Sequence, residues 1–128
     1  MTVIKRYSEN PILTKKDISY PVATIYNAAV TKFNGKYLML FRSNLLNGRS
    51  IIGLAESDDG YHFKPGKEPF LVPNTNGPFG VYEEYGVEDP RITKIDDVFY
   101  ITYSIYSRFG VRNALARTKD FGSVEKLA

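Results

Sequence analysis

The feature of the sequence that most constrains the fold is an internal repeat at a spacing of 62 residues. Residues 27–42 align with residues 89–104 without a gap, and each copy has two strand-like segments around a turn. Asn34-Gly35, the strongest short hairpin signal, is the turn of the first copy, and Asp96-Asp97 takes its place in the second. Each copy is therefore predicted to contain an antiparallel hairpin.

A third strand repeats as well, because residues 53–59 match residues 114–120 after the loss of one residue from the preceding loop. Residues 61–63 are predicted as a short fourth strand. A repeated antiparallel unit of three to four strands is typical of a β-propeller blade, whose sheet buries its faces against its neighbours. We predict an all-β chain of four-stranded antiparallel blades, with blade one at about residues 24–72 and blade two at about residues 86–128.

A propeller closes with at least about four blades, and this chain accounts for about two. The sequence shows neither a fourth strand for the second blade nor a closing strand at its end, Leu127-Ala128. Two sheets alone would expose faces that need partners. We therefore expect residues 1–128 to be a single partial propeller domain, either truncated from a longer enzyme with further C-terminal blades or completed by self-association.

Composition narrows the class of protein. A chain of 128 residues that is 43% hydrophobic and 24% charged has the balance of one soluble globular domain. The absence of cysteine excludes a disulfide scaffold and a thiolate metal site, and the sequence makes no case for any metal. The first residues gain charge too quickly for a signal peptide, which favours a cytoplasmic protein. No apolar run predicts a membrane span, and the scattered net charge of +3 gives no basic stripe for nucleic acid, although it suits an anionic small ligand.

The densest group of charges is Glu88-Asp89-Pro90-Arg91, at the start of the second copy. Pro90 keeps Asp89 extended and removes one hydrogen-bond donor, which predicts an acidic pair at the mouth of a strand. Strand alternation sends Asp89 and Arg91 to one face and Glu88 to the other. A surface turn with a salt bridge is the alternative interpretation.

Four features together resemble glycoside hydrolase family 130: Asn27 at the start of one strand, Arg42 at the end of the next, residues 86–91 and residues 116–121. The resemblance runs from about Asn10 to the C-terminus. It implies a five-bladed propeller enzyme, most members being inverting phosphorylases that cleave β-mannosides with inorganic phosphate to give α-mannose 1-phosphate. Some members are hydrolases.

The resemblance also implies site residues. Asp89 matches the general acid, Asn27 and Arg42 match residues that hold the sugar before the scissile bond, and Glu88 lies beside them. Tyr85 is a further candidate, because its ring could stack on a sugar face. The partners implied are an oligosaccharide and inorganic phosphate as co-substrate, with no other cofactor, and most of the phosphate site is expected from later blades.

Inverting cleavage needs one acid for the leaving oxygen and a nucleophile on the opposite face. In a phosphorylase, phosphate is the nucleophile, and arginine suits it through its bidentate fork. Arg108, in a tight loop, and Arg117, on a strand, are the candidate phosphate ligands. The alternatives are a solvated loop for Arg108 and an outward ion pair for Arg117.

Three functional readings stay open: a β-mannoside phosphorylase, a β-mannoside hydrolase, and a non-catalytic sugar-binding propeller fragment. One difficulty concerns the acid, since a general acid needs a raised pKa and a cation such as Arg91 on the same face of the strand would lower it.

The repeat makes a geometric prediction. Asn27 and Asp89 occupy equivalent places in adjacent blades, so their side chains should converge at a separation of about 10 Å.

Overall fold

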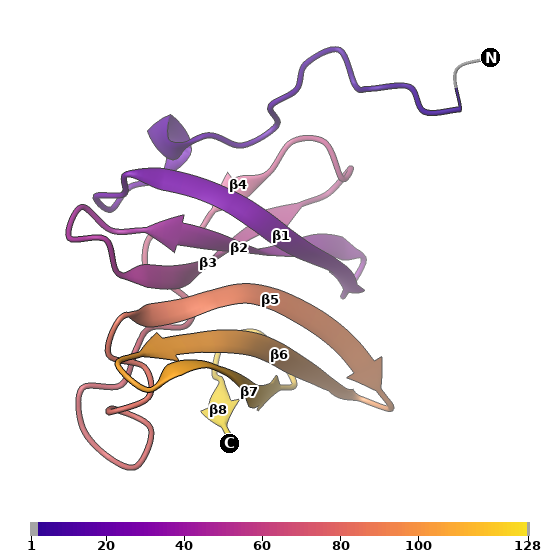
Figure 1. Ribbon diagram of the computed structural model, residues 1–128. Helices are drawn as coiled ribbons and strands as arrows, with labels where there is room; N and C mark the ends of the chain where they lie inside the picture. The colour runs from indigo at the N-terminus through magenta and orange to yellow at the C-terminus, as the bar shows by residue number, and fades with distance from the viewer. Residues whose placement is uncertain (1–2, 128) are drawn as a thin grey trace.

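A computed structural model of the protein describes residues 3–127. Across these residues the chain forms one short 3-10 turn, Lys15–Asp17, and eight strands. The strands, labelled in Figure 1, are β1 (Thr24–Phe33), β2 (Lys36–Asn44), β3 (Ser50–Ser57), β4 (Lys64–Pro65), β5 (Gly86–Ile95), β6 (Val98–Ser107), β7 (Gly110–Thr118) and β8 (Glu125–Lys126). The all-β prediction is confirmed. No helix in the described part of the chain is long and apolar enough to cross a membrane.

The strands pair in two antiparallel groups. In the first, here called the N-terminal unit, β1 pairs with β2, β2 with β3, and β3 with the short β4. In the C-terminal unit, β5 pairs with β6, β6 with β7, and β7 with the short β8. A single parallel bridge between Ser50 and Gly86 connects the units. Two details differ from the sequence prediction: β4 lies after residues 61–63, and a fourth strand does follow β7.

Along one edge of the molecule, at the left in Figure 1, lie the starts of β1, β3, β5 and β7 and the ends of β2 and β6. A continuous row of paired residues marks this edge, which we call the entry edge: Thr24, Asn44, Ser50, Gly86, Tyr106 and Val111. The pairing is unbroken from β1 to β7, so the strands of both units are aligned with one another at this edge. Residues a few positions inside it are therefore brought close together in space, although they lie far apart in the sequence.

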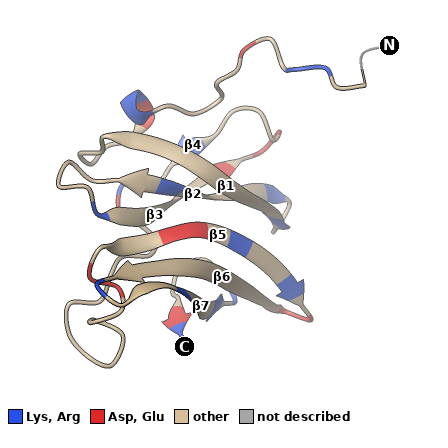
Figure 2. Cartoon of the chain, viewed as in Figure 1, with Lys and Arg blue, Asp and Glu red and all other residues tan. Residues whose placement is uncertain are grey.

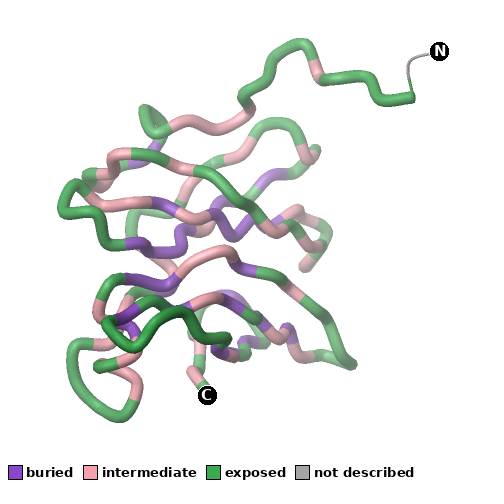
Figure 3. The backbone as a smooth tube through the Cα atoms, viewed as in Figure 1, coloured by how far each residue is buried: buried purple, intermediate pink, exposed green. Residues whose placement is uncertain are grey.

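The main core lies between the two units. Strand β2 contributes Leu40 and strand β6 contributes Phe99 and Ile101, all almost completely buried. Phe121 joins them from the turn after β7, with its ring centre 4.8 Å from that of Phe99. The buried residues of Figure 3 follow the facing strands of both units. Burial of this kind contributes about 25 cal/mol per Å² of apolar surface and holds the units together.

A second, smaller core covers the other face of the N-terminal unit. Met39 and Phe41 alternate along β2 with the residues that face the main core, as a strand with two buried faces requires. The segment before β1 packs on them through Ile12 and Ile18. Strand β2 is therefore buried on both faces, and it is the strand that carries Arg42.

The backbone repeats as closely as the sequence does. Asn27 and Asp89 have φ of 47° and 52°, and Asn34 and Asp96 have φ of 49° and 55°. Asparagine and aspartate are the residues that adopt this left-handed conformation most readily after glycine. Asn34-Gly35 forms the predicted turn between β1 and β2, so the hairpin prediction is confirmed.

Asn27 and Asp89 also lie at β-bulges, because the register of β1 shifts between Tyr26 and Ala28 and that of β5 shifts between Glu88 and Arg91. A bulge tolerates a proline inside a strand, since the residue there need not donate to the ladder. The acids therefore lie within β5 and not at its mouth, and this part of the sequence prediction was wrong.

Candidate active site

The guanidinium of Arg42 lies between two carboxylates of β5. Its Nη2 donates to Glu88 Oε1 at 2.9 Å, and its Nη1 donates to Asp89 Oδ1 at 3.2 Å. The side chains of Arg42 and Glu88 are only 16% and 18% exposed. Figure 2 shows the acidic stretch of β5 beside the basic position of β2. Charge-assisted bonds hold both carboxylates, Glu88 in a largely buried place and Asp89 in a more exposed one.

Strand alternation predicts that Glu88 and Asp89 point to opposite faces, and this prediction was wrong. Both reach the same guanidinium, because the bulge and the positive φ of Asp89 interrupt the alternation between them. Arg91 instead donates from Nη1 to the carbonyl oxygen of Pro90 at 2.8 Å. The two adjacent carboxylates therefore bind the same guanidinium, which the alternation of a regular strand would not allow.

Asn27 completes the contact between the units. Its Nδ2 donates to Asp89 Oδ1 at 2.8 Å, across 62 residues of sequence. The predicted convergence of these two side chains is confirmed, and it is closer than the expected separation. Asp89 Oδ1 thus accepts from Asn27 and Arg42 together, both of which belong to the N-terminal unit.

Two further residues support this cluster and were missed from the sequence. Ser50 Oγ donates to Glu88 Oε1 at 2.9 Å from the almost completely buried start of β3. The ring of Tyr26 lies 4.7 Å from Arg42 Cζ, a cation–π contact. Tyr26 donates its hydroxyl to Asn44 Oδ1 at 2.6 Å, which fixes the ring. In the sequence, the role of Tyr26 was indicated only by its position directly before Asn27, a residue of the family motif.

The protonation of Asp89 follows from these contacts. Partial burial opposes its ionisation, but the hydrogen bond from Asn27 and the hydrogen bond and charge of Arg42 outweigh burial. The pKa of Asp89 is consequently held below its ordinary value. Arg91 adds only a smaller charge effect in the same direction. In this state of the site Asp89 is a carboxylate anion near neutral pH.

The other predicted site residues lie farther out. Tyr85 is 42% exposed next to the entry edge, with its ring centre 5.3 Å from that of Tyr106. Arg108 forms a bidentate pair with Glu84, from Nε at 2.9 Å and from Nη2 at 2.7 Å. Arg117 donates from Nε to Glu125 at 2.7 Å.

Neither of these two arginines contacts the Arg42 cluster in the structure, and each is engaged by a carboxylate. The hydrogen bond from Arg108 lowers the pKa of Glu84 and the same contact raises the pKa of Arg108, so that pair stays ionised. Arg117 pairs across to Tyr100 on β6, and Tyr100 pairs with Thr93 on β5, which is four residues beyond Asp89. Their roles as phosphate ligands remain predictions.

An arginine clamped by two carboxylates at the meeting point of repeated antiparallel units defines a polar site in an all-β chain, and comparison with known proteins identifies its class. The family model described as beta-1,4-mannooligosaccharide phosphorylase matches residues 3–128. The chain belongs to glycoside hydrolase family 130, as the motifs predicted.

Individual relatives agree with this assignment. A β-1,2-mannobiose phosphorylase of Listeria innocua is 28% identical over 95% of this chain and 49% of its own length. One from a Thermoanaerobacter species is 34% identical over 88% of this chain and 39% of its own. Among solved structures, the Listeria innocua β-1,2-mannobiose phosphorylase in complex with β-1,2-mannobiose superposes with a TM-score of 0.79 at 27% identity, over 94% of this chain and 49% of that one. The chain spans about half the length of these relatives or less.

Proposed function

We propose that the protein carrying this chain is a β-mannoside phosphorylase, which cleaves the mannoside with inorganic phosphate and inversion to α-mannose 1-phosphate. The observation that carries the proposal is the convergence of Asn27, Arg42 and Asp89 in a member of this family. The substrate is a β-linked manno-oligosaccharide, in line with the relatives named above.

In this proposal Asp89 is the general acid. Its proton goes to the glycosidic oxygen as the bond to the anomeric carbon breaks, while a phosphate oxygen forms the new bond from the opposite face. The leaving sugar departs with the proton as a neutral alcohol. Asn27 and Arg42 hold the mannose that is transferred, and Tyr85 offers a ring to the sugar on the outer side.

Glu88 has a different role, because it is engaged by Arg42 and Ser50 together. It fixes the orientation of Arg42, and Arg42 in turn fixes Asp89. The adjacent acids are therefore not interchangeable: one is held to position a cation, and the other has the larger exposed fraction, 36% of its side chain, available to a substrate.

The lowered pKa of Asp89 must rise before it can donate a proton. Two events of substrate binding act in that direction. A sugar placed over Asp89 removes water from it, and a phosphate dianion nearby adds a like charge and competes for Arg42. The acid is then protonated when both substrates are bound, and it is ionised in the empty site.

For the complete fold, we propose that the N-terminal and C-terminal units correspond to two four-stranded blades of the five that the family resemblance implies. The common register, the 62-residue spacing and the shared core between the units support this. Further blades would supply most of the phosphate site. Arg108 and Arg117 have less support as phosphate ligands, because phosphate would have to displace a carboxylate from each.

The test is phosphate dependence. The expressed protein is incubated with β-1,2-mannobiose with and without inorganic phosphate, and the products are separated by anion-exchange chromatography. We expect mannose 1-phosphate only when phosphate is present. Free mannose formed equally without phosphate would identify a hydrolase, and binding of the disaccharide without either product would identify a sugar-binding module.

A further inference from the structure

The backbones of the two units approach each other closely where Ser50 begins β3 and Gly86 begins β5. Gly86 has φ of 141°, and a Cβ at this position would lie 2.5 Å from Ser50 N and 2.8 Å from Ser50 Cβ. Such an approach requires glycine, because a side chain would force the strands apart. We call this contact the junction. Glu88 follows Gly86 by two residues and so lies on the same side of β5.

A series of hydrogen bonds runs from the junction to the proposed acid. Ser50 Oγ donates to Glu88 Oε1 at 2.9 Å, and the same oxygen accepts from Arg42 Nη2 at 2.9 Å. Arg42 Nη1 then donates to Asp89 Oδ1 at 3.2 Å. The serine and the arginine come from the N-terminal unit, and both carboxylates come from β5. Each step of the series therefore crosses between the two units.

The series leads from the interior of the protein to its surface. Ser50 is only 1% exposed, the side chains of Glu88 and Arg42 are 18% and 16% exposed, and that of Asp89 is 36% exposed. A residue as buried as Ser50 cannot contact a sugar. Its effect on a reaction at Asp89 has to pass through Glu88, the acceptor of its hydroxyl group.

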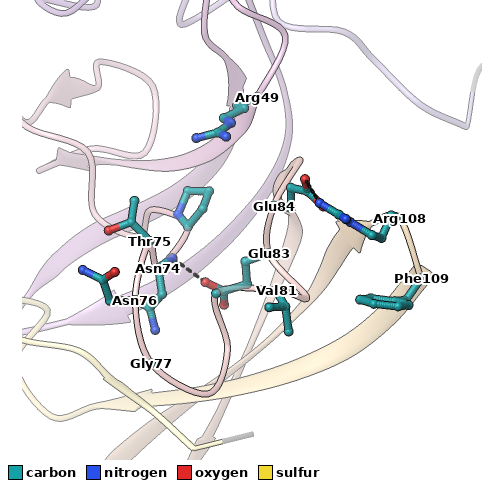
Figure 4. Close-up of a pocket in the computed structure, with 12 residues that line it drawn as sticks. Arg49, Asn74, Thr75, Asn76, Gly77, Val81, Glu83, Glu84, Arg108 and Phe109 are labelled. Carbon is teal, nitrogen blue, oxygen red and sulfur yellow. Dashed lines mark hydrogen bonds and ion pairs between the residues drawn. The ribbon is translucent and has the colours of Figure 1, made fainter.

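The β5 side of the junction is fixed by a buried network. The backbone nitrogen of Gly86 donates to the carbonyl oxygen of Glu83 at 3.0 Å. The side chain of Glu83, which is 1% exposed, accepts from the backbone nitrogen of Asn74 at 2.7 Å and from Lys126 Nζ at 2.6 Å. Figure 4 shows Glu83 and its contact with Asn74 in the loop of residues 73–84, the 73–84 loop, beside a cavity of about 530 Å³. The fold thus sets where β5 begins, and with it the place of Glu88 relative to Ser50.

The serine hydroxyl changes how Glu88 acts on its neighbours. A hydrogen bond to a carboxylate offsets part of its charge. Without that bond Glu88 attracts Arg42 more strongly, and it also presents a less compensated like charge to Asp89. Both changes raise the pKa of Asp89. The other groups that act on Asp89 are Asn27 of β1 and Arg91 of β5, which favour its ionised form and do not depend on the serine.

We propose that Ser50 is a positioning residue, which anchors Glu88 to β3 and thereby keeps Arg42 in contact with Asp89. The reaction that it serves rests on the proposed function above. The coupling of Ser50 to Asp89 is a property of the site itself, and it is measurable without turnover. On this proposal the acid depends on the contact between the two units as well as on the residues that face the substrate.

Replacement of the serine hydroxyl tests the proposal. Ser50→Ala should lower kcat for phosphorolysis of β-1,2-mannobiose about tenfold, roughly the effect of one lost hydrogen bond to a charged group, and should leave KM within about twofold. It should also raise the pKa of Asp89, followed by carboxyl NMR titration without substrate. Ser50→Cys should behave in the same way, because a thiol fills the space but donates weakly.

Ser43→Ala is the matched control. Ser43 is as buried as Ser50 and pairs with Ile51, the residue after it. It points to the opposite face of β2 from its neighbour Arg42. Its replacement should leave both kcat and the pKa of Asp89 unchanged. Equal effects of the two serine-to-alanine variants would overturn the proposal, because burial alone would then explain them.

A double-mutant cycle tests whether Glu88 transmits the effect. Once Glu88→Ala is present, adding Ser50→Ala should change neither kcat nor the pKa of Asp89 further. A further change of the size seen in the single Ser50→Ala variant would overturn the proposal. If the pKa of Asp89 responds as expected but no mannose 1-phosphate is released, the coupling stands and the proposed function fails. Phosphorolysis that Ser50→Ala and Ser50→Cys leave unchanged, together with an unchanged pKa, has the opposite meaning.

Discussion

Asn27 in the N-terminal unit and Asp89 in the C-terminal unit occupy one place in two copies of the same backbone. Each lies within a register shift, and their φ angles of 47° and 52° are nearly equal. The neighbouring pairs also correspond: Tyr26 faces Arg42 across β1 and β2 as Glu88 faces Ser104 across β5 and β6. The backbone is therefore shared, and the side chains differ.

The difference divides the site into complementary halves. The N-terminal unit contributes the cation, the amide and the aromatic ring, and the C-terminal unit contributes both carboxylates. Two identical units would have brought like charges together, which a partly buried site does not tolerate without a large pKa shift. Divergence of a repeated unit thus converts one structural position into a pair of interacting groups. The following predictions test how far the two units have become distinct.

Exchange of the residues at the equivalent positions is expected to have the largest effect. Asp89→Asn should reduce turnover about 10²–10⁴-fold, the usual contribution of a general acid, with substrate binding largely retained. Its fold should persist, because Asn27 shows that asparagine accepts this backbone conformation. The double exchange Asn27→Asp with Asp89→Asn should not restore turnover, since the carboxylate then sits on the wrong unit. The measurement is the initial rate of mannose 1-phosphate release.

A substrate with a very good leaving group serves as the control for this assignment. It needs little protonation and should lose less activity in Asp89→Asn than a natural disaccharide does. Equal losses on both substrates would argue against Asp89 as the proton donor. Recovery of turnover in the double exchange would show that the units are interchangeable at this position.

The turns after the third strands provide the next comparison. Gly60 has φ of 79°, and Phe121, its equivalent, has φ of 56° and is 6% exposed in the core between the units. Phe121→Ala should lower the free energy of unfolding by about 3–5 kcal/mol through the cavity it leaves. Phe121→Gly should be about 1 kcal/mol more stable than Phe121→Ala, because glycine has no strain at positive φ.

Gly60→Ala is the matched variant in the N-terminal unit. The atoms nearest to a Cβ at Gly60 belong to the Tyr37 ring, at an ordinary contact distance of 3.5 Å, so the cost of the substitution is conformational and about 1 kcal/mol. Urea unfolding measures all three variants. If Phe121→Ala cost no more than Gly60→Ala, the aromatic contacts of Phe121 would not hold the units together.

A smaller effect is expected at the equivalent positions Arg42 and Ser104. Arg42→Met should cost about 2 kcal/mol of unfolding free energy, because it leaves two partly buried carboxylates without their charge-assisted bonds. Ser104→Ala should stay within about 0.5 kcal/mol of the wild type. Loss of Arg42 should also raise the pKa of Asp89, which carboxyl NMR titration can follow. An unchanged pKa would place the control of this carboxylate elsewhere.

The sequence alone correctly predicted the structural features that depend on a local residue pattern or on the repeat. Asn34-Gly35 predicts its turn because glycine and asparagine accept positive φ, and the 62-residue offset predicts the meeting of Asn27 with Asp89 because equivalent strands share one register. Strand alternation failed at Glu88 and Asp89, because Pro90 fits either the mouth of a strand or a bulge within it, and the local pattern does not distinguish the two.

Other features depend on partners that only the folded chain brings together. Arg108 meets Glu84 across 24 residues, and Ser50 meets Glu88 across 38. The two-residue strand β8 is too short to show a periodic pattern, although it carries Lys126 and so anchors the 73–84 loop. Loops and short edge strands are held by such individual contacts, whereas long strands are held by repeated ones.

The smallest expected effect concerns the turns that follow β3 and β7, which contain Asp59 and Asp120. Asp59 Oδ1 accepts from the backbone nitrogens of Tyr61 and His62, and Asp120 Oδ1 accepts from those of Gly122 and Ser123, at distances between 2.8 and 3.0 Å. These bonds lower the pKa of both carboxylates. Their stabilising contribution is present above the ordinary carboxyl pKa of about 3.9 and is lost as the pH falls through the lower folded values.

One of the differences between the two turns is that His62 stands where the C-terminal turn has Ser123, and its Nδ1 lies 2.6 Å from Asp59 Oδ2. The hydrogen bond and charge of Asp59 raise the pKa of His62. A raised folded pKa stabilises the protein fully below the ordinary histidine value of about 6.5, and this stabilisation is lost as the pH rises through the folded pKa. His62→Ser, which copies the other turn, should therefore be less stable than the wild type at about pH 5.5, with the difference fading at alkaline pH. Ser123→Ala should show no such pH dependence, and thermal unfolding across this range measures both variants. A His62→Ser deficit that stayed constant with pH would mean that the two turns differ by packing and not by the charge on His62.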